Sequence, residues 1–427
     1  MSNPSASSKT PNNNLPILLL LLVLLLIFAS PYLVWVLLPS RDLPGLIVDK
    51  TVPDHTYREH NGLIWALNYY KVQPPESEAD AWRKAQDYIG FYPAPKPVFS
   101  AKNPGEGVEL STEPLQGKQW LYVTDTYGVY HQDVENAAAY EKRQELEGLP
   151  FSNTEAQTPL LSPDYSPHIY GGTQHAEIDA LEAFAQRGGH VIGEFNLFAS
   201  PTKAAERERL ETFFGVRWTG WTGRFFVKLE NEEEVPVWAR ENYLRAYGIP
   251  WDFSGKGWLF VHEDGRIGVL EEDERSERKT VERDVPPQAL KIYLTQPQDD
   301  LLNGVYDKVP YTYWFDIIEA EPAQVLAEYG FEAHNKGAER LKALGIPLRF
   351  PFMVKSSSEP LRMYVAGDAS DRDQDATIYQ LKGRLSWERF GRFKESQDSQ
   401  EAFFWEFYLP WIGNVLDHVA TRPCVEC

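Results

Sequence analysis

The chain has 427 residues, of which 62 are acidic and 42 are basic, and its formal net charge at pH 7 is −20. This charge excludes nucleic acid as a partner, because phosphate binding needs a basic face, and it argues equally against a surface that binds anionic lipid. The hydrophobic fraction of 43% supports a real core, and the length suits two domains or one large domain with insertions.

An apolar segment near the N-terminus is long enough to cross a membrane. Ile17 to Leu38 carries no charge, so a helix over these residues can span the ~30 Å hydrocarbon core. The run exceeds the ~7–15 residues of a usual signal-peptide core, and residues 16–39 are therefore interpreted as an uncleaved anchor. Cleavage near Phe28 to Ser30 is the alternative. The preceding residues, 1–15, are rich in Ser, Asn and Pro and are predicted to be disordered.

The charges on either side of this segment predict its orientation. Lys9 and the amino terminus precede it without any acid, whereas Arg41, Asp42 and Lys50 follow it. By the positive-inside rule, we expect an inner N-terminus and a body outside the cytoplasm. The alternative leaves the body in the cytoplasm.

Strands and helices alternate from residue 45 to residue 214. The expected strands are 45–52, 119–124 and 190–194. The expected helices are 57–72, 79–88, 131–150, 174–187 and 203–214, and Pro- and Gly-rich loops are expected at 94–117 and 151–173. This alternation predicts a parallel sheet with helices on both faces.

From Val216 the sequence becomes aromatic and Gly-rich. The strands expected at 258–261 and 266–270 flank Glu263-Asp264-Gly265, which predicts a hairpin. Further strands are expected at 311–318, 348–354 and 361–367, helices at 322–329, 336–344 and 402–419, and a solvated charged loop at 271–284. Residues 231–420 are predicted to form an α+β part that completes the first sheet or packs on it.

Five short apolar runs stop at an acidic residue. The five acids are Asp49, Asp125, Glu194, Asp316 and Asp368. In open α/β folds, ligands bind beyond the carboxyl ends of the strands, so acids that follow parallel strands can gather at one rim. We therefore predict an acidic pocket suited to a polyol, a cation or acid–base chemistry. The first three acids have the better claim to share it, because they lie in the alternating half of the chain.

Residues beside these acids extend the candidate site. Lys50 could hold an anion, and Asn196 lies in the loop after the third strand. Tyr127 follows Asp125 in a sharp turn that would expose its ring, and sugar sites pair carboxylates with aromatic faces. Each feature has a structural alternative, since Asp49 and Lys50 can form a buried ion pair and Asp125 can cap the next turn.

Motifs for metals and cofactors are absent from the sequence. The two cysteines, Cys424 and Cys427, form a CxxC pair without a second pair, and we interpret residues 421–427 as a tail. The acids at 371, 373 and 375 are spaced as in a calcium loop, but Ala376 and Lys382 occupy the positions of the required Gly and Glu, which excludes an EF-hand. A looser cation site stays open. No H-E-x-x-H motif or phosphate-binding glycine loop occurs, so no metal and no cofactor are expected.

Three elements resemble the class I glutamine amidotransferase-like superfamily, in particular its trehalose-utilisation-protein-like branch. They are the first strand and helix, the strand that leads into residues 125–130, and the succession of helix, Gly188-Gly189, strand and Phe214-Gly215-Val216. The resemblance covers residues 45–230 and implies a flavodoxin-like or amidotransferase-like parallel sheet, here preceded by one transmembrane helix. The chain is also similar to uncharacterised single-pass bacterial membrane proteins, which implies that it is anchored in the inner membrane of a bacterium.

The chain departs from that superfamily at the functional elbow. True amidotransferases carry a cysteine there, with His and Glu partners, whereas this sequence has Gly193-Glu194-Phe195-Asn196. A thiolate route to glutamine hydrolysis is therefore excluded, and glutaminase activity is not expected from the fold.

Three functions remain open. The first is an extracytoplasmic, non-thiol domain that binds a polar ligand, such as a saccharide or an envelope glycan, at the acidic rim. The second is a carboxylate-dependent glycan hydrolase with Asp125 and Glu194 as its acid–base pair. The third is a scaffold that binds an envelope protein through the aromatic strip Trp218 to Phe226, for which core packing is the structural alternative.

Overall fold

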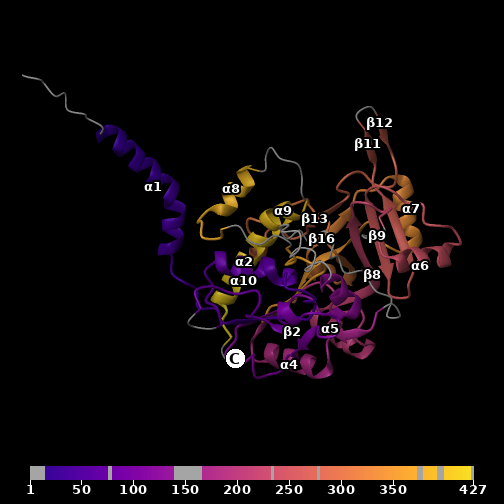
Figure 1. Cartoon of the computed structure of the whole chain (residues 1–427), viewed down its shortest axis with the longest axis horizontal. Helices are drawn as coiled ribbons and strands as arrows, with labels where there is room; N and C mark the ends of the chain where they lie inside the picture. Colours follow the sequence, from indigo (N-terminus) through magenta and orange to yellow (C-terminus); the bar gives the residue numbers. More distant parts are fainter. Residues whose placement is uncertain are drawn as a thin grey trace, which may run out of the picture.

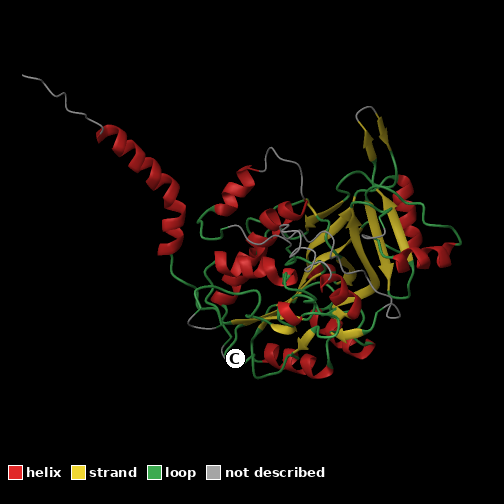
Figure 2. Cartoon of the chain, viewed as in Figure 1, coloured by secondary structure: helices red, strands yellow, loops and turns green. Residues whose placement is uncertain are grey.

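The computed structural model describes residues 15–75, 79–138, 166–231, 235–276, 279–372, 378–391 and 399–424. The chain forms a mixed α/β body with one apolar helix projecting from it (Figures 1 and 2). A ten-stranded sheet and a four-stranded sheet make up most of the body, and helices pack around them.

The N-terminal helix α1 (Leu15–Leu37) is, within the described residues, the helix that is long and apolar enough to cross a membrane. Its length and composition also fit a signal sequence. The helix continues through Pro31, which has no N–H to bond the Ile27 carbonyl one turn earlier. The Ser30 hydroxyl donates to that carbonyl at 2.8 Å, which satisfies the acceptor that the proline leaves free.

The other helices cover the sheets. Their bounds are α2 (Asn61–Tyr69), α4 (His175–Gln186), α5 (Ala204–Phe214), α6 (Val237–Tyr247), α7 (Asn335–Leu344), α8 (Arg384–Gly391), α9 (Ser399–Phe403) and α10 (Leu409–Thr421). Residues 131–138 are also helical, and the rest of the helix predicted at 131–150 lies outside the described residues. A π-helical turn at Phe404–Tyr408 joins α9 to α10, so the predicted aromatic helix at 402–419 is present as three pieces.

Five parallel strands form the centre of the large sheet. In spatial order they are β2 (Ile89–Pro93), β1 (Gly45–Asp49), β4 (Trp120–Val123), β7 (His190–Gly193) and β18 (Arg362–Val365). Numbered along the chain, this order is 2-1-3-4-5, so the direction of progress across the sheet reverses between β1 and β4. Strands β1, β4 and β7 are buried throughout, which explains why they read as continuous apolar runs.

Antiparallel strands extend this centre at both edges. Beyond β18 lie β17 (Arg349–Lys355), β16 (Val325–Phe331), β13 (Leu290–Leu294) and β14 (Val309–Pro310), and beyond β2 lies β3 (Gly105–Gly107). The C-terminal half of the chain therefore contributes strands to the same sheet as the N-terminal half.

The second sheet stands beside the carboxyl end of β18. Its order is β10 (Ile267–Glu271), β9 (Gly257–His262), β8 (Val216–Phe226) and β15 (Phe315–Ala320), and the predicted hairpin over residues 258–270 is confirmed as β9 and β10. An antiparallel bridge between Phe315 and Gly367 connects the two sheets. Among the described residues, two small pairs account for the remaining strands: β5 (Val129–Tyr130) with β6 (His168–Tyr170), and β11 (Glu274–Ser276) with β12 (Lys279–Val281).

The helix predicted at 79–88 is wrong. These residues form turns, and the apolar stretch after them is strand β2. The Asn68 side chain bonds both the backbone N–H and the carbonyl of Trp82, at 2.8 and 3.0 Å, and Asp87 accepts from the backbone N–H of Arg83. These side-chain bonds occupy backbone groups that a helix would need.

The helix predicted at 322–329 is also wrong. A short 3-10 turn at Pro322–Gln324 is followed by β16, which lies between β13 and β17. A strand buried on both faces carries apolar residues without alternation, and such a run cannot be told from a helix by its periodicity. The charged loop predicted at 271–284 contains the β11–β12 hairpin.

The pairing of β1 with β2 predicts a strong effect of substitution at Gly90. A Cβ atom there would lie 1.6 Å from the backbone oxygen of Asp49, and the φ of +151° disfavours other residues. We expect Gly90→Ala to lower the free energy of unfolding by at least about 3 kcal/mol, measured by urea titration of the full chain in detergent. Gly345→Ala is the control, since its φ of +76° is strained but no atom lies within 4 Å. It should cost only about 1–2 kcal/mol, and equal losses would contradict the packing.

Candidate functional site

Four of the five predicted acids follow neighbouring parallel strands and therefore meet at one edge of the sheet. Asp49 is the last residue of β1, and Asp125, Glu194 and Asp368 follow β4, β7 and β18. All four side chains are at most 5% exposed. The reversal of strand order lies between β1 and β4, so Asp49 and Asp125 flank the position where open α/β sheets bind ligands.

The fifth acid, Asp316, reaches this edge from the other sheet. The prediction that it closes a strand is wrong, because β15 begins at Phe315 and continues beyond it. The bridge to Gly367 nevertheless brings it beside the end of β18, where its backbone N–H donates to the Ala366 carbonyl at 3.0 Å. Asp368 thus joins the other acids through β18, and Asp316 joins them through this bridge.

The charges of these acids interact. Burial raises the pKa of Asp125 well above its usual range, and the carboxylates of Asp49 and Asp316 raise it further. Burial likewise raises the pKa of Asp368, with smaller contributions from neighbouring acids that include Glu194 and Asp125. The five acids therefore form one electrostatically connected cluster, which we call the acidic rim.

Asp49 and Lys50 face different partners. The Asp49 carboxylate accepts from the Thr51 backbone N–H at 2.9 Å and bonds His60 Nδ1 at 2.5 Å. Lys50 Nζ donates to the carboxylates of Glu109 and Glu177 and to the Gly172 carbonyl.

Lys50 is 1% exposed, and an ammonium group has three donors. All three have acceptors, so Lys50 has none left for an external anion. It ties the end of β1 to the first turn of α4, where its partner Glu177 also closes the capping box with Gln174.

Glu194 holds the loop that follows β18. Its Oε1 accepts from the backbone N–H groups of Ala369 and Ser370, at 2.6 and 2.5 Å. Its Oε2 is fully buried and has no hydrogen-bond partner among the described residues. Burial raises the pKa of Glu194 to about 8, although the two backbone N–H groups that donate to it favour its ionised form. The carboxyl group is therefore largely protonated at neutral pH.

Asp316 holds the loop that follows β7. Its Oδ2 accepts from the Asn196 backbone N–H at 3.0 Å and from the Tyr364 hydroxyl at 2.6 Å, and its Oδ1 accepts from the Thr222 hydroxyl at 3.1 Å. Asn196 has a φ of +68°, a left-handed conformation that this bond helps to fix. Both carboxylate oxygens are thus used to position neighbouring elements.

Three buried carboxylates, one of which belongs to the acidic rim, could hold a cation. Glu59, Asp368 and Asp371 each offer one oxygen, and these oxygens lie within 4.8 Å of one another. Oxygen ligands of this type suit Mg²⁺ or Ca²⁺. Arg58 compensates part of the charge, through Glu59 at 2.9 Å and Asp371 at 3.6 Å. Asp373 and Asp375, the other acids of the calcium-like spacing, lie outside the described residues.

A second group, His190, Glu359 and His418, is also compact enough for a metal. His190 uses both ring nitrogens for backbone contacts, with the Arg422 carbonyl at 2.7 Å and the Leu361 N–H at 3.1 Å. This histidine is therefore engaged in structure, and the group is a poor metal site.

A cavity of about 430 Å³ opens next to the acidic rim. Tyr127 and Asn196 are among the residues that line it. The other walls come from β8, α6 and the β9–β10 hairpin, with Trp218, Trp238 and Asn242 among them. Asn196 Oδ1 is buried and has no hydrogen-bond partner among the described residues. The lining of the cavity therefore combines aromatic rings, amides and charged groups.

Two aromatic predictions are changed by the structure. Tyr127 is 7% exposed rather than exposed, because its ring packs on Tyr130 with centroids 4.9 Å apart. Trp218, Trp221 and Phe226 are buried in the hydrophobic cores, so the strip is core packing.

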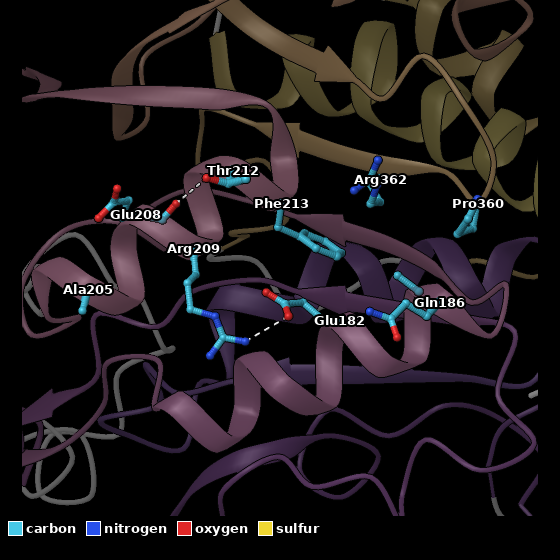
Figure 3. A pocket seen from close by; sticks show the side chains of 10 residues that line it. Glu182, Gln186, Ala205, Glu208, Arg209, Thr212, Phe213, Pro360 and Arg362 are labelled. Carbon is cyan, nitrogen blue, oxygen red and sulfur yellow. Dashed lines mark hydrogen bonds and ion pairs between the residues drawn. The ribbon is translucent and has the colours of Figure 1, made fainter.

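Another cavity lies away from the rim. It measures about 580 Å³ and lies between α4 and α5, with Pro360 and Arg362 at one end (Figure 3). Arg209 crosses it to bond Glu182 at 2.9 Å. No rim acid lines this cavity, so it is separate from the candidate site.

Sequence reasoning missed several residues of the site. Glu59 was overlooked because it lies in a 3-10 turn between the first strand and α2, without a strand-end pattern. Trp238 and Asn242 were overlooked because no element was expected at 237–247, although their i, i+4 spacing places them on one face of a helix.

Comparisons with known proteins give little further evidence. No protein-family model and no curated protein matches the sequence. A crystal structure of a thua-like protein from Bacteroides uniformis matches 81% of this chain and 91% of that chain, with 10% sequence identity and a TM-score of 0.30. A TM-score this low supports no shared function.

The bonds of Glu194 predict different effects for two substitutions. Glu194→Gln keeps an oxygen for the amides of Ala369 and Ser370, so its free energy of unfolding should stay within about 1 kcal/mol of the wild type. Glu194→Ala leaves both buried N–H groups unpaired and should cost about 2–4 kcal/mol. Urea unfolding of the full chain in detergent measures both values, and equal losses would contradict this anchoring role.

The pKa of Asp316 predicts a pH-dependent stability. Burial raises it from 3.8 to about 6, so the folded protein binds this proton more tightly than the unfolded chain. The free energy of unfolding therefore falls as pH rises from about 4 to about 6, by at most roughly 3 kcal/mol, and stays lower above that range.

Asp316→Asn removes this titration. Its amide oxygen can accept from Asn196 and Tyr364, and its amide nitrogen can donate to Thr222. From pH 4 to pH 7 the free energy of unfolding of the wild type should therefore fall relative to that of the variant, as measured by urea titration at each pH. A difference between the two proteins that does not change with pH would refute the assignment.

Proposed function

We propose that the chain is a membrane-anchored, extracytoplasmic protein whose α/β body binds a polar ligand of the saccharide class. Helix α1 supplies the anchor, and the cavity beside the acidic rim supplies the binding site. The strand order 2-1-3-4-5 is that of flavodoxin-like sheets, which supports the further proposal that the body is amidotransferase-like. The absence of a cysteine on the elbow makes this a non-thiol member.

The observation that carries the proposal is the composition and place of the 430 Å³ cavity. Its size lies in the usual range for small-ligand sites, ~300–1,000 Å³. Its lining includes the polar side chains of Asn242, Arg245 and His262 together with the indole rings of Trp218 and Trp238. Sugars present both hydroxyl groups and C–H patches, and this lining provides partners for both.

The orientation of the cavity also fits. Figure 1 shows α6 and β9, which line it, at the opposite end of the body from α1. A ligand bound there would be held away from the membrane, where a glycan chain can reach it.

Hydrolysis by Asp125 and Glu194 is the second candidate. The raised pKa of Glu194 is suitable for a general acid at neutral pH. However, neither carboxyl group lines the described cavities, and one oxygen of Glu194 already accepts two backbone bonds. The geometry therefore favours binding over hydrolysis.

The binding proposal predicts a selective effect of Asn242→Ala. The Asn242 side chain is half-exposed and makes no hydrogen bond with the described residues, so its loss should leave the thermal stability unchanged. We expect full-length protein in nanodiscs to be stabilised by one of a panel of neutral and acidic oligosaccharides, and Asn242→Ala to weaken that binding at least about tenfold.

Leu244→Ala is the matched control, because Leu244 is exposed on the same helix and does not line the cavity. It should bind like the wild type. An oligosaccharide panel without any thermal shift, or a shift that both variants preserve, would contradict the proposal.

A further inference from the structure

The end of α1 is docked on the body rather than joined to it by a free linker. Trp35 Nε1 donates to the Tyr69 carbonyl at 3.0 Å, and its ring packs on Tyr379 with centroids 5.7 Å apart. Lys71 Nζ donates to the carbonyls of Trp35 and Val36, each at 3.1 Å, which satisfies the last turn of the helix. The position of the body along the axis of α1 is therefore fixed.

The segment 378–391 contacts the C-terminal part of α1. The Lys382 N–H donates to the Pro31 carbonyl at 3.0 Å. Pro31 is six residues before the end of α1 at Leu37, which corresponds to roughly 9 Å along the helix axis. A helix that spans the bilayer with Pro16–Leu37 places its last two turns near the boundary between hydrocarbon and headgroups.

Helix α8, within this segment, has an outward apolar face. Trp387 and Phe390 are 67% and 81% exposed, and their i, i+3 spacing places them together. The basic side chains of α8 face the body instead. The Arg384 guanidinium lies 5.4 Å from the centroid of the Trp405 ring, and Arg389 donates to the Trp405 carbonyl at 3.2 Å. Ile378, at the start of the segment, is also 61% exposed.

We infer that Ile378, Trp387 and Phe390 form a second membrane contact, which dips into the interfacial layer of the bilayer beside α1. The inference rests on the anchoring role of α1 in the proposed function. Figure 1 shows α8 on the side of the body from which α1 projects. Exposed tryptophan at the membrane–water interface is favourable because its ring is apolar and its N–H is polar.

The occupant of this face is lipid rather than a second protein, because the contact is continuous with the anchor. The hydrogen bond from Lys382 to Pro31 holds the segment against a helix whose own surface must lie in lipid. With two attachment points, the body has a fixed tilt on the membrane, which directs the cavity between α6 and β9 away from the bilayer.

Fluorine NMR of the full chain in phosphatidylcholine nanodiscs tests this contact. The protein is labelled with 5-fluorotryptophan, and a lipid with a doxyl group at carbon 5 of its acyl chain broadens nearby signals. Three variants assign the signals. The signal that disappears in Trp387→Phe belongs to α8, and the signal that appears in Phe28→Trp belongs to the anchor. The signal that disappears in Trp251→Phe belongs to the far end of the body.

We expect the doxyl lipid to remove most of the intensity of the α8 and anchor signals and to leave the Trp251 signal intact. Broadening of the anchor signal without the α8 signal would overturn the second contact while preserving the anchor, and would point to a protein partner or to water. Loss of neither signal would overturn both the anchor and the contact.

Discussion

The cost of burying carboxyl groups at the end of a parallel sheet is the constraint on which the rest of this structure depends. Five acids gather there at most 5% exposed, and a charged group taken out of water must be paired, hydrogen-bonded or neutralised. The chain uses each of these solutions. Asp49 bonds a histidine, Asp316 accepts three bonds, and Glu194 combines two amide donors with a pKa of about 8.

These solutions also build the candidate site. The bond from the Asn196 N–H to Asp316 fixes the loop after β7, and the bond from the Tyr127 N–H to Asp125 at 2.6 Å fixes the loop after β4. Both loops contribute residues to the lining of the cavity. The acids therefore act mainly through the residues that they position, and the groups that face the cavity come from the second sheet and from α6.

Much of the architecture could be predicted from the sequence. The double glycine correctly predicted the end of α4. The apolar runs predicted β1, β4 and β7 correctly, because a buried parallel strand needs a continuous apolar sequence. The same signal failed for β16, because a strand buried on both faces has no periodicity. It failed again at 79–88, because the bonds that Asn68 makes with Trp82 are long-range contacts without a local pattern.

The site was predictable only in part. Strand ends identified the acidic rim, since parallel strands must place their carboxyl ends at one edge. The sequence could not show that Asp316 comes from another sheet, or that Lys50 is enclosed by Glu109 and Glu177. It also could not show that the cavity lies beside the acids rather than among them, because that depends on how the β8–β10 strands pack on the first sheet.

The protonation state of Glu194 tests the central claim most directly. An infrared difference spectrum between the wild type and Glu194→Gln, recorded at pH 7 on the full chain in nanodiscs, isolates this side chain. We predict that the wild type shows the C=O stretch of a protonated carboxylic acid that the variant lacks. If the wild type instead shows a carboxylate band that the variant lacks, and no carboxylic acid band, the account that burial keeps this acid neutral is contradicted.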